Sequence, residues 1–118
     1  MVALPSLLPA VLDVPESGLV LRELATVWHR EGIKTQNSDT LARARALYSE
    51  YLDKFKGEKD EYRMTWYYAE LLWSLEAWEP AADNYTKVVK LDPKGAHVKE
   101  AAYAAVLAWK NALNVDDA

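Results

Sequence analysis

The chain has 118 residues, of which 51% are hydrophobic and 27% are charged, a balance typical of a soluble globular domain that forms a core. The net charge of −4 makes nucleic acid a poor candidate partner, because phosphate binding needs clustered cations. The absence of cysteine excludes disulfides and thiolate chemistry, and it leaves the cytosol and a bacterial periplasm or cell envelope equally open.

Residues 1–14 are expected to form an irregular apolar segment. The stretch from Met1 to Leu12 is interrupted by Pro5 and Pro9 and contains no basic residue. It is too short to cross a bilayer and lacks the charged front of a secretory signal, so we expect no direct membrane insertion of this segment. At the opposite end, residues 114–118 form a short acidic tail.

Residues 15–113 carry helical periodicity. We expect the first helix to begin near Pro15, which suits a first turn, and to end at Gly32. Residues 34–38 are then a polar loop. Asp39 is a candidate N-cap for the second helix, and Gly57 fits a left-handed stop after it.

The next three helices follow in the same manner. Asp60 is a candidate cap for the third helix, Pro80 fits the first turn of the fourth, and Pro93 and Gly95 end the fourth. The fifth runs from about residue 97 to residue 113. No segment shows convincing strict alternation, and the gaps are short, so the sequence predicts an all-α chain of about five helices arranged as antiparallel hairpins.

The predicted helices repeat. A shift of 37 places Ala44 on Ala81 and Tyr48 on Tyr85, and a shift of 36 places residues 67 and 73 on residues 103 and 109. A period of this length is two helices with their turns, a unit that must stack on its neighbours to bury its apolar face. A solenoid of helical hairpins is therefore expected.

One unit, residues 62–95, resembles the tetratricopeptide repeat family. Ala69 stands where the family has a small residue, Ala81 and Tyr85 give its alanine-to-aromatic spacing, and Pro93 closes the unit; Leu72 and Trp78 fit as well. The chain departs from the pattern at Thr65, at Val88 and in the first repeat, where Gly57 replaces the closing proline. The resemblance implies a short right-handed superhelix that binds proteins.

In that family the first helix of each repeat lines a concave groove. Trp66, Glu70 and Trp73 share one side of the third helix, and a helix that is apolar on a second side must bury it against something else. Tryptophan is also a preferred anchor in binding hot spots. The equally weighted alternative is that these tryptophans only fill contacts between repeats. The groove positions that the resemblance implies are Arg63, Trp66, Glu70, Trp73, Ser74, Lys99, Ala102, Val106, Trp109 and Lys110.

Catalysis is not expected. The two histidines, His29 and His97, are isolated in the sequence, and no metal-binding or phosphate-binding motif is present. We therefore expect no metal and no cofactor. Trp66 and Glu70 also replace the lysine and asparagine with which some family members grip a terminal carboxylate, which makes that mode of binding doubtful.

The leading hypothesis is a protein-binding scaffold module of a larger bacterial assembly, which holds a peptide or helix in a tryptophan-lined groove. A second is a structural block that forms a homo-oligomer through its apolar terminal helices, which full burial of Trp66 and Trp73 would favour. A third is a helical ligand-binding or catalytic bundle around a closed pocket.

Overall fold

The computed structural model describes residues 17–114, and within that range the chain is helical with no strand, as predicted. The predicted N-terminal segment, Pro15 and all but the first residue of the acidic tail lie outside the described residues. The chain divides into two compact units, residues 1–56 and 57–118, each described by itself. The helices are α2 (Ser17–Thr35) and α3 (Ser38–Lys54) in the first unit, and α4 (Glu61–Ser74), α5 (Trp78–Leu91) and α6 (Val98–Ala112) in the second.

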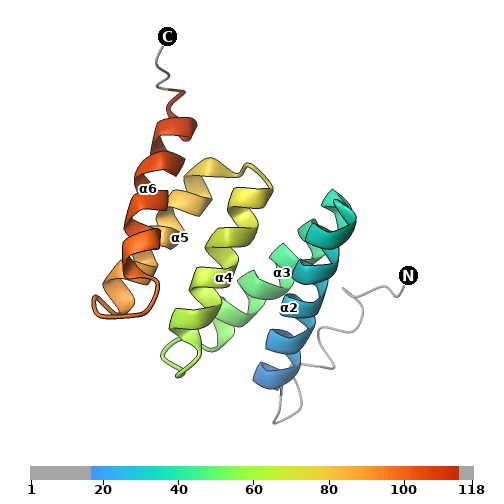
Figure 1. The fold of residues 1–118 in the computed structure, drawn as a ribbon. Coiled ribbons are helices and arrows are strands. Elements are labelled where there is room, and N and C mark those ends of the chain that lie inside the picture. The colour runs from blue at the N-terminus through green and yellow to red at the C-terminus, as the bar shows by residue number, and fades with distance from the viewer. Residues whose placement is uncertain (1–16, 115–118) are drawn as a thin grey trace. The chain divides into compact units, whose positions relative to one another are not determined.

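In the first unit α2 and α3 form an antiparallel hairpin (Figure 1). Gly32 does not end α2, as we had expected, because the helix continues to Thr35. Gly32 is buried where α2 meets α3, and a Cβ there would lie 2.5 Å from Leu41 Cδ2 and 2.7 Å from its Cγ. Glycine is therefore needed for close helix packing. The helix ends at Gln36, whose φ of 53° lies in the left-handed region.

The N-cap of α3 is Asn37 and not the predicted Asp39. The Asn37 Oδ1 accepts a 3.1 Å hydrogen bond from the backbone N–H of Thr40, which has no partner within the helix. Asp39 lies in the first turn instead, where a negative charge favours the positive end of the helix dipole. Both residues suit a helix start, and only the backbone position of Asn37 allows the cap.

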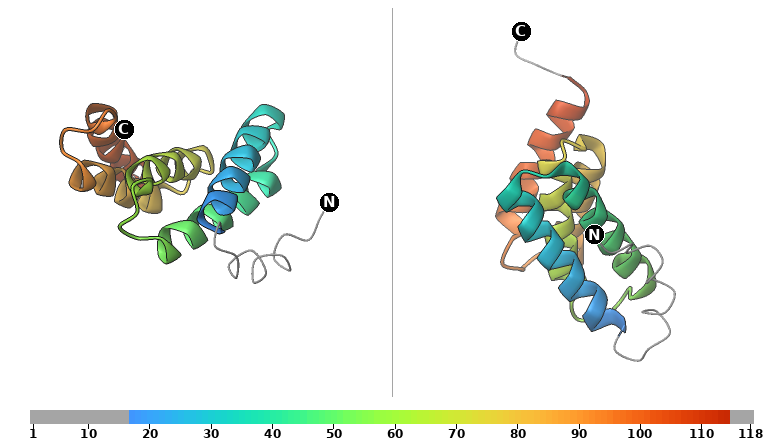
Figure 2. Two further views of the ribbon diagram at one scale, coloured as in Figure 1. Left: turned by 90° about the horizontal axis from the view of Figure 1, so that it is seen from below. Right: turned by 90° about the vertical axis from the view of Figure 1, so that its right-hand side faces the viewer.

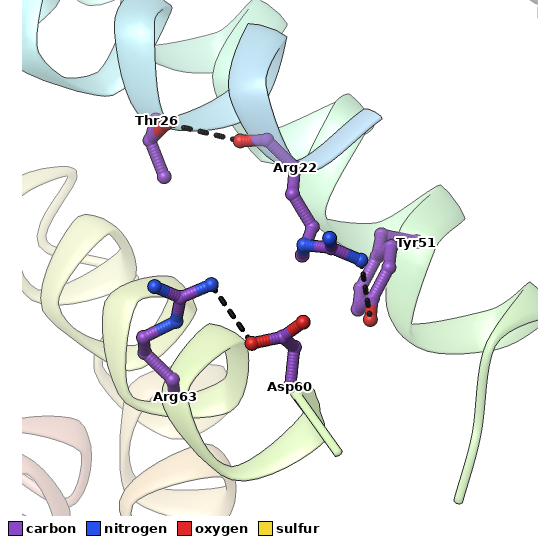
Figure 3. A network of polar contacts seen from close by, with 5 residues as sticks. All are labelled: Arg22, Thr26, Tyr51, Asp60 and Arg63. Carbon is purple, nitrogen blue, oxygen red and sulfur yellow. Dashed lines mark hydrogen bonds and ion pairs between the residues drawn. The ribbon is translucent and has the colours of Figure 1, made fainter. Parts of the chain in front are cut away.

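Polar side chains of α2 reach aromatic rings of α3. Arg22 donates a 3.4 Å hydrogen bond to the Tyr51 hydroxyl, and its guanidinium lies 5.6 Å from the centre of that ring (Figure 3). His29 Nδ1 lies 2.7 Å from the Tyr48 hydroxyl, and burial lowers the pKa of this histidine. Tyr48 and Tyr51 are fully buried, so the hairpin core is partly built from tyrosines that keep a polar partner.

The turn after α3 contains a left-handed glycine, as predicted. α3 ends at Lys54, and Gly57 has a φ of +84°. Its N–H donates a 3.0 Å hydrogen bond to the Glu61 side chain. At the start of α4, Asp60 occupies the predicted N-cap position but makes no side-chain cap. Its carboxylate instead accepts from Arg63 at 2.8 Å, so the predicted cap is wrong and the acid is used in an ion pair (Figure 3).

In the second unit consecutive helices run antiparallel, and α5 packs against both α4 and α6 (Figures 1 and 2). Pro80 lies in the first turn of α5, and Pro93 and Gly95 follow its last residue, as predicted. The core is unusually rich in small residues. It consists of Ala69, Leu72, Ala81, Ala82, Tyr85, Val88, Ala101, Ala105 and Ala108. Alanine at facing positions allows the helix axes to approach closely.

Candidate protein-binding surface

Tyr85 of α5 joins the three central residues of the predicted groove. Its ring centre lies 5.7 Å from that of Trp66 and 6.3 Å from that of Trp73, both with edge-to-face geometry. Its hydroxyl donates a 2.5 Å hydrogen bond to Glu70 Oε1. Trp66, Glu70 and Trp73 lie on one side of α4 because they are spaced by four and three residues, and each is half-buried. We call Trp66, Glu70, Trp73 and Tyr85 the aromatic–acid cluster.

The hydrogen bond to Glu70 is charge-assisted. Burial, followed by the bond to Glu70 and the negative charge of that residue, raises the pKa of Tyr85 far above its usual value of 10.0. Tyr85 is therefore the proton donor at every physiological pH, and the Glu70 carboxylate is held in one place. The sequence identified Tyr85 only as the aromatic residue of the repeat spacing and did not predict this role. The only signal was the presence of tyrosine in place of phenylalanine at a buried position.

Trp66 is anchored by the turn before α6. The ring of His97 stacks on it at 4.4 Å with an interplanar angle of 8°, and the Tyr62 ring lies 6.2 Å from His97 on a similar plane. The backbone N–H of His97 donates a 2.8 Å hydrogen bond to the Tyr62 hydroxyl. A Cβ at Gly95 would overlap the Tyr62 ring, so glycine permits this crossing. His97 thus packs between aromatic rings.

Trp73 is held at the other end of the cluster. Its ring centre lies 4.8 Å from that of Trp78, at an interplanar angle of 82°. Trp78, which we had expected in the turn, is the first residue of α5. Trp66 and Trp73 are thus neither fully buried nor free, since both pack against the core cluster and keep part of their surface exposed. This geometry is intermediate between the groove and the repeat-contact interpretations.

The other predicted groove residues are less constrained. Arg63 is exposed and pairs with Asp60, and Ser74 is exposed and donates a 3.2 Å hydrogen bond to the backbone oxygen of Glu70. On α6, Trp109 is half-buried against the core cluster. The remaining four are exposed: Lys99, Ala102, Val106 and Lys110. The structure therefore brings together the central α4 residues through Tyr85.

The outer face of α6 carries large apolar side chains. Tyr103, Val106 and Leu113 are 69%, 66% and 67% exposed. The buried residues of the same helix are all alanines, at positions 101, 105 and 108. We call Tyr103, Val106 and Leu113 the α6 stripe.

Comparison with known proteins gives no relative: no family model, no curated protein and no solved structure matches the chain. Among residues 17–114, no group of three histidine or acidic side chains is placed to hold a metal ion. No helix in that range has the length and apolar character needed to cross a membrane. The arrangement of side chains therefore carries the functional argument alone.

Proposed function

We propose that this chain is a tetratricopeptide-like protein-interaction module, without catalytic activity, that holds a peptide or helix of another protein against the aromatic–acid cluster. The antiparallel hairpins and the buried small residues Ala69 and Ala81 support the family resemblance. In this proposal the hairpins stack as a short right-handed superhelix and the module serves a larger bacterial assembly. It needs no metal and no cofactor.

The observation that carries the proposal is the partial exposure of two immobilised tryptophans beside a carboxylate. Trp66 and Trp73 each contact two other aromatic rings, which fix their orientation before any partner arrives. A rigid aromatic ring loses little conformational entropy on binding, so its exposed surface contributes to affinity. Tryptophans with a structural role alone would fill that role equally well if they were fully buried, so their partial exposure favours a role in binding.

The test is selection of peptides from a displayed random library on the immobilised full chain. Two variants then locate the binding site. Trp66→Ala/Trp73→Ala removes the anchors, and Ser74→Tyr/Ala102→Tyr adds bulk at exposed groove positions without touching the core. We expect selected peptides to lose at least tenfold in affinity for both variants, with folding verified by circular dichroism. Peptides that bind the folded blocking variant as well as the unmodified chain would contradict the proposal.

The α6 stripe favours a second candidate function, self-association. An exposed apolar face that includes three large side chains is typical of an interface, and a second copy of the chain offers the same face. Val106→Glu and Leu113→Glu change only exposed positions. The measurement is sedimentation at about 100 µM, on the order of the concentration at which weak dimers form. If the chain self-associates through the α6 stripe, the unmodified chain is a dimer and the double variant is a monomer. A monomer in both cases eliminates this candidate.

A further inference from the structure

We propose that the segment bound at the aromatic–acid cluster carries an arginine or lysine side chain, which pairs with the Glu70 carboxylate and lies against the rings of Trp66 and Trp73. This inference rests on the proposed function and adds the chemistry of the partner.

Glu70 is a half-buried carboxylate with unused acceptor capacity. An ionised carboxylate accepts about four hydrogen bonds, and among residues 17–114 the only side-chain donor to the Glu70 carboxylate is the Tyr85 hydroxyl, through Oε1. Within residues 17–114 no cationic side chain pairs with it. Because Glu70 is only partly buried, water can reach its remaining acceptor positions. A cationic side chain from a partner can take the place of that water.

The two tryptophans suit the same ligand. They lie four residues before and three residues after Glu70, so both indoles lie on its side of α4, one helical turn away in each direction. Tryptophan is the strongest aromatic partner of a cation, and the attraction adds to that of a neighbouring carboxylate. A cation bound at Glu70 therefore gains from the ring faces as well as from the charge.

The first unit uses this chemistry internally. The Arg43 guanidinium lies 5.8 Å from the centre of the Trp28 ring, and that of Arg22 lies 5.6 Å from the centre of the Tyr51 ring. In the second unit no described arginine or lysine lies over the ring of Trp66 or Trp73, and His97 covers one face of Trp66 only. The aromatic–acid cluster thus presents aromatic rings of the kind that arginine side chains contact in the first unit.

The nearest cation on the same helix does not occupy the place. Arg63 lies seven residues before Glu70, roughly 10 Å along the helix axis, and its guanidinium is paired with Asp60 at 2.8 Å. An acidic peptide would meet the fixed carboxylate of Glu70 between the two indoles and would be repelled. A neutral apolar segment would cover Glu70 without satisfying it. Only a cationic side chain pairs with the Glu70 carboxylate and is also attracted to the rings of Trp66 and Trp73.

The experiment takes the peptides selected on the full chain and measures their affinity for Glu70→Gln and for the matched control Glu79→Gln. Glu79 is an exposed acid in the first turn of α5, so its variant removes the same charge outside the cluster. We expect the site-dependent peptides to be enriched in arginine or lysine. Their affinity should fall about tenfold in the Glu70 variant, a typical size for a close charge pair with a ring contact, and less than twofold in the control.

The outcomes separate the two proposals. Peptides that need the cluster tryptophans but lack excess arginine and lysine, or that bind Glu70→Gln undiminished, overturn the cationic inference and leave the proposed function intact. Equal losses in Glu70→Gln and Glu79→Gln also overturn it, because they indicate long-range attraction only. Failure to obtain any peptide that depends on Trp66 and Trp73 overturns both.

Discussion

The contact between Gly32 and Leu41 predicts that a substitution favourable for an isolated helix destabilises this protein. Replacing an interior helix glycine by alanine normally stabilises by about 1 kcal/mol. In Gly32→Ala the new Cβ would overlap Leu41 Cδ2 and Cγ, and it would lie 3.1 Å from the Leu41 backbone nitrogen. Leu41 is only 6% exposed, so its side chain has little room to move.

The magnitude follows from two opposed effects. Overpacking of a buried contact costs about 1–3 kcal/mol, and the gain in helix propensity offsets about 1 kcal/mol of this. We therefore expect Gly32→Ala to lower the free energy of unfolding by roughly 1 kcal/mol, measured by urea denaturation followed by circular dichroism. A Leu41→Ala background removes the overlap with Cδ2 and Cγ and leaves only the 3.1 Å approach to the backbone nitrogen, so the same substitution should destabilise less there.

The matched control is Gly18→Ala in the same helix. Among residues 17–114, the atom nearest to a Cβ at Gly18 belongs to the Phe55 ring, at 3.3 Å. This variant should be neutral or weakly stabilising. The reasoning is refuted if Gly32→Ala raises the free energy of unfolding as much as helix propensity alone predicts, or if the Leu41→Ala background does not reduce the destabilisation.

Three further predictions concern titration and the exposed helix. Because the folded state raises the pKa of Tyr85, the unfolded chain alone releases that proton above pH 10.0; stability should therefore fall as pH rises further, less steeply in Tyr85→Phe, as urea denaturation would show. Because burial lowers the pKa of His29 below 6.5, its contribution to stability should be fully present above that pH and should be lost as the pH falls through the pKa of the folded state. His29→Gln should remove this pH dependence in the same urea assay. The imidazole NMR signals of His29 should titrate below the ordinary value. Val106→Glu and Leu113→Glu should each change the free energy of unfolding by less than about 0.5 kcal/mol in thermal denaturation, since both side chains are exposed, and a larger loss would show that the stripe is covered.

Periodicity and turn residues were sufficient to predict the all-helical fold and most helix ends. The start of α5 near Pro80 and the span of α6 were predictable because they depend on residues close by in the sequence. Gly32 was misassigned because a glycine that stops a helix and one that admits a neighbouring helix are the same in sequence. Only the position of Leu41, on another helix, distinguishes them.

The candidate site was predictable only in part. Helical spacing places Trp66, Glu70 and Trp73 on one side of α4, which needs no tertiary information. The bond from Tyr85 and the stacking of His97 on Trp66 join residues of different helices, and no local pattern encodes them. The exposure of the α6 stripe likewise depends on which face of a largely apolar helix packs inward. In the structure, the face that carries Ala101, Ala105 and Ala108 packs inward.

The most direct test of the proposed binding surface is NMR mapping of a selected peptide on the full chain, with the indole N–H signals as reporters. The chain contains 5 tryptophans, and Trp28 lies in the first unit, so it serves as an internal control. The account predicts that the largest shifts occur at Trp66 and Trp73, that Trp28 is unaffected, and that Ser74→Tyr/Ala102→Tyr abolishes the shifts. Shifts centred on Trp28, or on Tyr103 and Val106 with Trp66 and Trp73 unmoved, would contradict it.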